Sequence, residues 1–175
     1  LYRLAEWLHT RLHPAERRVA LVTDAANWVL DWETCYLQRG LREESDLHAR
    51  RVRYPHLLTG QVIHYINRYP YVKGDYRRID ASNQVVLTWY HGQPEDPEFA
   101  PIYDGLRAAA PRVSRIVTAC TTSRQALIRA GIDATRITVI PISIDRELFT
   151  PPNGAQRQHA RESLGIPPDA VCIGC

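Results

Sequence analysis

A histidine and a glycine end an apolar, β-branched run in this sequence of 175 residues. Residues 84–90 read QVVLTWY, and His91 and Gly92 follow directly. Because glycine allows a sharp turn of the backbone, His91 can be held at the end of a strand rather than inside the core. We therefore take His91 as a tentative catalytic residue and Gly92 as a substrate-binding position. The alternative is a histidine that only fixes the turn.

Tyrosines and basic residues alternate in residues 68–82, RYPYVKGDYRRIDAS, which show no helical or strand periodicity. We expect a loop here, and a loop of this length in a compact domain is often functional. Tyrosine faces can stack on sugar rings, whereas arginine and lysine can bind phosphate or carboxylate groups. Tyr69 and Tyr71 are therefore candidate substrate-binding residues. The alternative is a solvated surface loop.

A polar turn follows the first predicted strand, residues 18–23. In a doubly wound sheet this turn lies at the carboxyl edge, where ligands bind. Asp24 suits either an N-cap of the next helix or a substrate contact. Asn27 and Trp28 are free to touch a sugar in that position. All three residues are candidate substrate-binding residues.

Four cysteines, Cys35, Cys120, Cys172 and Cys175, fall on elements that we expect to be buried, which is typical of reduced thiols in a core. Cys172 and Cys175 have a C-x-x-C spacing, but on a strand residues three apart point to opposite faces. We therefore predict no metal site.

The segment that positions these candidates runs over residues 114–152, SRIVTACTTSRQALIRAGIDATRITVIPISIDRELFTPP. Two β-branched runs, 115–120 and 136–140, flank a short amphipathic helix. Thr122 and Gln125 have the spacing of a capping box, which predicts a helix start at Ser123. Gly131 is placed to end the helix in a left-handed conformation. The segment therefore predicts a βαβ unit with parallel strands and a right-handed crossover.

This segment resembles the end of the N-terminal domain of family 4 glycosyltransferases, which are retaining, nucleotide-sugar-dependent enzymes with two Rossmann-like domains (the GT-B fold). The resemblance is carried by the following residues: Gly131, Ile140, Pro141, Asp145, Phe149 and Pro151. Ile142 and Ser143 stand where the family often has Asn-Gly. A strand that ends in His-Gly also agrees with the family, in which the histidine often faces the cleft.

The resemblance implies an α/β fold with a doubly wound, mostly parallel sheet, the Rossmann-like N-terminal half of a GT-B enzyme. Residues 1–150 would form the acceptor-side domain, and 151–175 a linker and the start of a truncated donor-binding domain. The full-length parent would transfer a sugar from a nucleotide sugar to an acceptor hydroxyl with retention, in carbohydrate biosynthesis. No cofactor is implied, because the nucleotide sugar is a substrate. The 175-residue chain alone should be inactive.

The other predicted elements are helices over 1–13, 102–110 and 156–164 and strands over 46–54, 61–67 and 170–175. The strand over 46–54 should lie near the sheet edge, because its outward residues are charged. The strand over 170–175 would lack its own sheet, so the chain could self-associate through it.

The composition suits one globular domain, with 45% apolar residues. The net charge of +3 comes from 22 basic and 19 acidic residues spread along the chain, which argues against nucleic acid as a partner. No apolar run approaches the ~20 residues that a transmembrane helix needs, so we expect a cytoplasmic location. Expected partners are a sugar or lipid-linked acceptor and a nucleotide-sugar donor. The rival interpretation is a non-catalytic doubly wound domain that binds a nucleotide or a partner.

Overall fold

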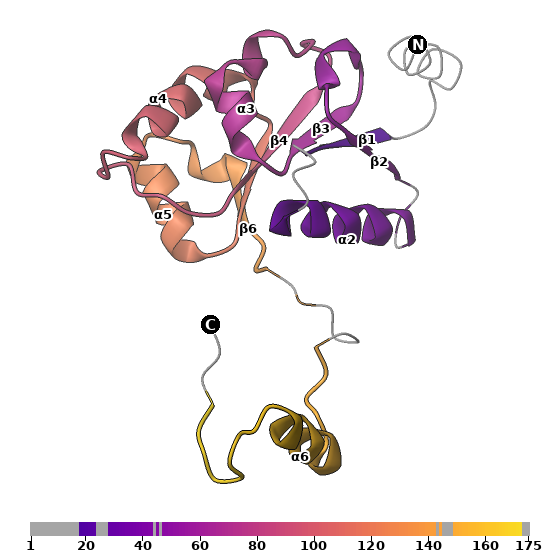
Figure 1. Ribbon diagram of the computed structural model, residues 1–175. Helices are drawn as coiled ribbons and strands as arrows, with labels where there is room; N and C mark the ends of the chain where they lie inside the picture. Colours follow the sequence, from indigo (N-terminus) through magenta and orange to yellow (C-terminus); the bar gives the residue numbers. More distant parts are fainter. Residues whose placement is uncertain are drawn as a thin grey trace. The chain divides into compact units, whose positions relative to one another are not determined.

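The computed structural model describes residues 18–23, 28–43, 45, 47–142, 144 and 149–172 (Figure 1). The chain divides into two compact units, Leu1–Pro141 and Ile142–Cys175. The helix predicted over residues 1–13 lies outside the described residues, as do Asp24, Asn27 and Asp145.

The first unit is built on a six-stranded sheet in the order β2-β1-β3-β4-β5-β6, in which every neighbouring pair is parallel. The strands are β1 (Arg18–Val22), β2 (His48–Val52), β3 (Val62–Tyr65), β4 (Gln84–Trp89), β5 (Arg115–Thr118) and β6 (Ile137–Val139). The chain moves outward from β1 to β2 and then back across β1 to β3. The structure therefore confirms the α/β, Rossmann-like fold class, and the charged β2 is an edge strand as predicted.

Helices cover both faces of this sheet (Figure 1). They are α2 (Val29–Glu43), α3 (Arg68–Lys73), α4 (Ala100–Ala109) and α5 (Thr121–Arg129). Successive side chains of β1 point to opposite faces. Accordingly, Ala20 and Val22 join the large core under α3, α4 and α5, whereas Val19 and Leu21 join a smaller cluster with Leu37 of α2. Short 3₁₀ turns complete the unit: Pro55–Leu57, Asp75–Arg77, Ala110–Arg112 and Ala134–Arg136.

The predicted βαβ unit is present as β5, α5 and β6, with the two strands paired in parallel. Gly131 ends α5 with φ 88°, and the Ile132 N–H donates to the Leu127 carbonyl, as a left-handed helix end requires. The predicted capping box is wrong, because α5 begins at Thr121, before Ser123. Ser123 is instead buried and donates its hydroxyl to the Tyr90 carbonyl at 2.9 Å. Ser123 thus connects the first turn of α5 to the end of β4.

The segment 68–82 is not the loop that its lack of periodicity predicted. It forms α3 and a 3₁₀ turn, because the Asn67 side chain caps α3 by accepting from the Tyr69 N–H. Tyr71 and Val72 then bury their side chains in the core. Packing therefore stabilises a helix that is too short to show a periodic pattern.

The second unit contains α6 (Gly154–Ser163), which Asn153 and Gln156 begin with a capping box. Gly165 follows with φ 66°. The strand predicted over 170–175 is not formed by Ala170–Cys172, and residues 173–175 are not described. The self-association that we expected through this strand stays a prediction. Among the described residues, no helix has both the length and the apolar character needed to cross a membrane.

The cysteines do not lie in the core as predicted. Cys35, Cys120 and Cys172 are free and exposed, and Cys175 lies outside the described residues. Cys35 lies on α2, where its sulfur accepts from Arg51 Nη1 of β2 at 3.3 Å, and Cys120 lies beyond the end of β5. No group of three or more metal-ligating side chains occurs in the described ranges.

Gly105 allows α4 to approach α3 closely. A Cβ atom at Gly105 would lie 2.5 Å from the backbone oxygen of Val72, whereas one at Gly40 of α2 would meet nothing within 4 Å. We expect Gly105→Ala to lower the free energy of unfolding by about 1–3 kcal/mol, because the two helices must separate. The control Gly40→Ala should raise it by about 0.5–1 kcal/mol through helix propensity. Urea denaturation measures both changes, and equal effects would show that the close approach is unimportant.

His64 makes the stability of the sheet depend on pH. Its Nε2 lies 2.8 Å from Thr88 Oγ1 on the neighbouring strand, and burial lowers the pKa of His64 from 6.5 to about 4. The unfolded chain therefore binds a proton at this residue below pH 6.5, whereas the folded chain does not until about pH 4. Stability should fall by roughly 2 kcal/mol between pH 7.5 and pH 5.

His64→Gln should remove this part of the pH dependence, which denaturant titrations at the two pH values would measure. His159→Gln is the control, because His159 is exposed on α6. An unchanged slope in His64→Gln would contradict the assignment.

Candidate functional site

Polar residues gather at the carboxyl edge of the sheet, where all the strands end together. Parallel pairing aligns Val22 of β1 with Tyr65 of β3, and Trp89 of β4 with Thr118 of β5. The direction of chain progression reverses between β1 and β3, and ligands of doubly wound sheets bind beside such a reversal. The residues that follow β1, β3 and β4 therefore form the candidate site.

The turn after β4 holds His91 in an exposed position. Gly92 has φ 103°, and a Cβ atom on it would lie 2.7 Å from the ring of Phe99. The Tyr103 hydroxyl donates to the Gly92 carbonyl at 2.8 Å, and Phe99 packs edge-on against the His91 ring at 5.5 Å. The turn thus requires glycine at position 92, as the sequence predicted, and it leaves the imidazole open to solvent.

One cationic and one acidic neighbour shift the pKa of His91 in opposite directions. Burial lowers its pKa first, and the Arg68 guanidinium lowers it further, whereas Glu98 acts in the other direction. The net shift is downward, so the neutral imidazole is favoured. In this form His91 can accept a proton or a hydrogen bond at one ring nitrogen and donate at the other.

Tyr90, the residue before His91, fixes the end of β4 to the opposite face of the sheet. Its hydroxyl donates to Glu33 of α2. Burial, and then the bond to Glu33, raises the pKa of Tyr90. The backbone on either side of His91 is therefore held by α2 and by α4.

Arg68 is the first residue of α3 and enters the candidate site from the end of β3. Its side chain is only 3% exposed, and the guanidinium lies over the ring of Trp89 at 4.5 Å and over the ring of Tyr69 at 4.7 Å. Sequence reasoning treated Arg68 as one of several basic loop residues. Its burial could not be foreseen, because it depends on Trp89 of another strand.

The two tyrosines predicted to bind a substrate have different positions. Tyr69 is half-buried beside Arg68, with Lys73 Nζ 5.4 Å from its ring centroid. Tyr71 is fully buried and packs against Tyr65 at 4.9 Å, and its hydroxyl donates to the Arg112 carbonyl. The structure therefore corrects the stacking role of Tyr71, since a core side chain cannot stack on a sugar. Trp28 is 46% exposed at the start of α2.

A pocket of 380 Å³ opens beside the ends of β1, β2 and β3. Its lining includes Thr23, Arg53, His56, Asn67, Asp75 and Arg78. His56 Nε2 lies 3.7 Å from Asp75 Oδ1, and the Tyr65 hydroxyl donates to Asp75 Oδ2 at 3.3 Å. These donors and acceptors suit a ligand that is rich in hydroxyl groups. Sequence reasoning missed the pocket, because its residues come from three separate turns.

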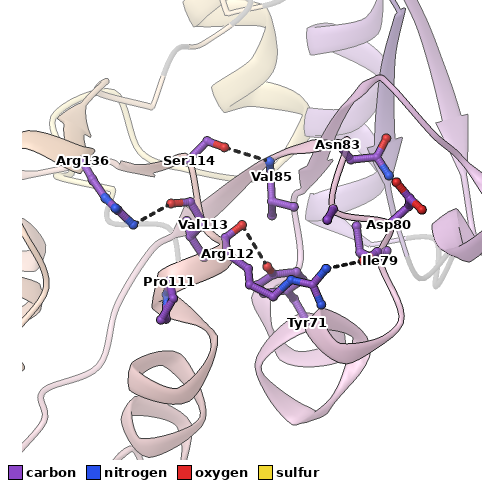
Figure 2. Close-up of a pocket in the computed structure, with 11 residues that line it drawn as sticks. Tyr71, Ile79, Asp80, Asn83, Val85, Pro111, Arg112, Val113, Ser114 and Arg136 are labelled. Carbon is purple, nitrogen blue, oxygen red and sulfur yellow. Dashed lines mark hydrogen bonds between the residues drawn. The ribbon is translucent and has the colours of Figure 1, made fainter.

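A second pocket, of 430 Å³, lies at the opposite, amino edge of the sheet (Figure 2). Its arginines are engaged with backbone carbonyls. Arg112 donates to the Ile79 and Tyr76 carbonyls at 2.6 Å, and Arg136 donates to the Val113 carbonyl at 3.1 Å. The two arginines of this pocket therefore form structural hydrogen bonds that hold its loops in place. For this reason we assign the candidate site to the pocket at the carboxyl edge instead.

Comparisons with known proteins support the fold. No protein-family model matches the sequence, and no curated protein matches it with statistical significance. The solved structures that match include HepE of Anabaena in complex with UDP, at 16% identity and a TM-score of 0.53, over 85% of this chain and 50% of HepE. HepE in complex with UDP and glucose matches at 16% identity and a TM-score of 0.52, over 86% of this chain and 50% of HepE. The chain therefore spans about half the length of these proteins.

Proposed function

We propose that the unit formed by residues 1–141 is the acceptor-side half of a GT-B glycosyltransferase. The parent enzyme would transfer a sugar from a nucleotide-sugar donor to an acceptor hydroxyl. The observation that carries this proposal is the match of 85–86% of this chain to half of a protein whose crystals hold UDP, and in one case glucose as well. The resemblance of residues 114–152 to family 4 enzymes supports transfer with retention, because that family is retaining.

The candidate site suits the acceptor. The pocket beside β1, β2 and β3 offers carboxylate, amide, imidazole and guanidinium groups, which bind sugar hydroxyls in a fixed orientation. A sugar, or the sugar end of a lipid-linked acceptor, fits this chemistry. His91 lies at the same edge of the sheet and is exposed. In this proposal His91 would contact the reacting hydroxyl or the transferred sugar.

Sugar transfer from a nucleotide donor releases a diphosphate, and stabilising that charge requires fixed cationic groups or helix N-termini. In the GT-B family the second domain supplies most of these groups together with the paired carboxylates. The two substrates must also be held at reacting distance between two walls. In this proposal the unit of residues 1–141 would form only one side of the cleft between the two domains. The nucleotide sugar would be a substrate rather than a cofactor.

We expect the 175-residue chain to fold cooperatively but to transfer no sugar, because the donor wall belongs to the second domain. The test incubates this chain, and separately the complete product of its gene, with a panel of nucleotide sugars that includes UDP-glucose, and measures the nucleotide released with acceptor mixtures present. Turnover by the complete product alone supports the proposal. Turnover by the 175-residue chain would refute the assignment of the donor site, and tight binding without turnover by the complete product would favour the non-catalytic alternative.

His91→Ala should lower kcat/KM of the complete enzyme by more than about tenfold, which corresponds to the loss of one polar contact of ~1.4 kcal/mol. The melting temperature should change little, because the imidazole is exposed. His159→Ala is the matched control, since His159 is an exposed histidine of the second unit. Unaltered kinetics in His91→Ala would show that the histidine only fixes the turn.

A further inference from the structure

Arg68 is a buried cation that has no acidic partner within the part of the chain that the structure describes. Its side chain is 97% buried by area, and none of the described aspartate or glutamate residues forms an ion pair or a hydrogen bond with it. Moving a guanidinium from water into a protein is costly, so buried arginines are normally paired with carboxylates. Burial accordingly lowers the pKa of Arg68.

The protein satisfies only part of the hydrogen-bonding capacity of this guanidinium. Nη2 donates to the Tyr69 hydroxyl at 3.3 Å, which is a long bond, and Nε is buried with no acceptor among the described residues. A guanidinium carries five N–H groups. The aromatic faces of Trp89 and Tyr69 attract the positive charge, but they accept no in-plane hydrogen bond. Some N–H groups in the plane of the guanidinium therefore have no acceptor among the described residues.

The surroundings hold the guanidinium in a fixed position at the carboxyl edge. Asn67 caps α3 immediately before Arg68, and the Trp89 ring packs on Tyr103 at 4.9 Å. Three phenols among the described residues raise the pKa of Arg68 against the effect of burial, namely Tyr69, Tyr103 and Tyr90. The exposed His91 is near enough for Arg68 to lower its pKa, after the effect of burial. The buried cation therefore acts on an exposed side chain at this edge of the sheet.

We propose that Arg68 binds an oxyanion of a substrate, a phosphate or a carboxylate group, beside His91 at the ends of β3 and β4. Two coplanar N–H groups of arginine match two oxygen atoms of such a group. Stacking on Trp89 sets the plane of the fork before the ligand arrives, which reduces the entropy lost on binding. Lysine offers a point charge without this fork, so it cannot replace arginine fully.

This proposal rests on the proposed function only in assigning the oxyanion to a substrate. The anion has two sources in such a reaction, the diphosphate of the donor or an acidic group on the acceptor. Binding of simple anions by the chain needs no sugar transfer, so it can be tested separately. Failure of the transfer assay would leave the anion site intact, and failure of anion binding would leave the transferase proposal intact.

The test titrates the 175-residue chain with inorganic phosphate, pyrophosphate, UDP and glucuronate in a calorimeter. Arg68→Met should weaken the binding of the preferred anion by at least about tenfold, as expected for a charge-assisted bidentate contact. Arg68→Lys should bind with intermediate affinity. Arg77→Met is the matched control, because Arg77 makes the same kind of contact with the preceding tyrosine, with Nε 3.0 Å from the Tyr76 hydroxyl, but is exposed.

The imidazole resonances of His91 provide a second measurement in NMR pH titrations. The bound anion should raise the pKa of His91 in the wild-type chain, and Arg68→Met should raise it without any anion. The melting temperature separates a binding role from a structural one. Without anion, Arg68→Met should melt within about 3 °C of the wild type or above it, because it removes an unpaired buried charge.

Preference for UDP or pyrophosphate would assign the site to the donor, and preference for glucuronate or phosphate to the acceptor; both support the proposal. It is overturned if no anion binds to the wild-type chain at millimolar concentration, or if Arg68→Met and Arg68→Lys both bind as the wild type does. A large fall in the melting temperature of Arg68→Met, with anion binding by Arg68→Lys unchanged, would show a packing role instead.

Discussion

The parallel pairing of β1 with both β2 and β3 is the constraint on which the rest of the structure depends. All five residues of β1 are buried, because the strand is flanked by β2 and β3 and has helices over both faces of the sheet. Because the chain leaves β1 for β2 and returns to the other side of β1 for β3, the direction of chain progression reverses there. The pocket beside β1, β2 and β3 lies at this reversal, and the parallel direction of β4 brings His91 to the same edge.

Tyrosines connect the core to the loops around it. The rings of Tyr65, Tyr71 and Tyr103 are fully buried, whereas their hydroxyl groups reach Asp75, the Arg112 carbonyl and the Gly92 carbonyl. A tyrosine of this kind contributes apolar area inside and one hydrogen bond at the rim. The turn at Gly92 is therefore as rigid as the helix that holds it. Rigid positioning of this kind is what a substrate contact at His91 requires.

The sequence predicted what depends on local pattern and missed what depends on packing between distant residues. All six strands of the sheet lie within their predicted ranges, since β-branched runs bounded by Gly and Pro are strong signals. Gly131 and Gly92 were predicted for a physical reason, the positive φ that both adopt. In contrast, α3 depends on Tyr71 and Val72 reaching the core, and the burial of Arg68 depends on Trp89. Trp89 lies 21 residues further along the chain (89 − 68), which is beyond the reach of any periodic pattern.

The junction between β3 and α3 joins two chemically different parts of the candidate site. Asn67 lines the pocket beside β1, β2 and β3, while the guanidinium of the next residue, Arg68, lies over the ring of Trp89. A neutral sugar needs balanced donors and acceptors, which the first part supplies through His56 and Asp75. An oxyanion needs donors alone, which the second part supplies. A structure that depended only on stability would pair this buried cation with a carboxylate of its own. If Arg68 binds an oxyanion as proposed, its place next to Asn67 means that the start of α3 would orient both ends of one substrate.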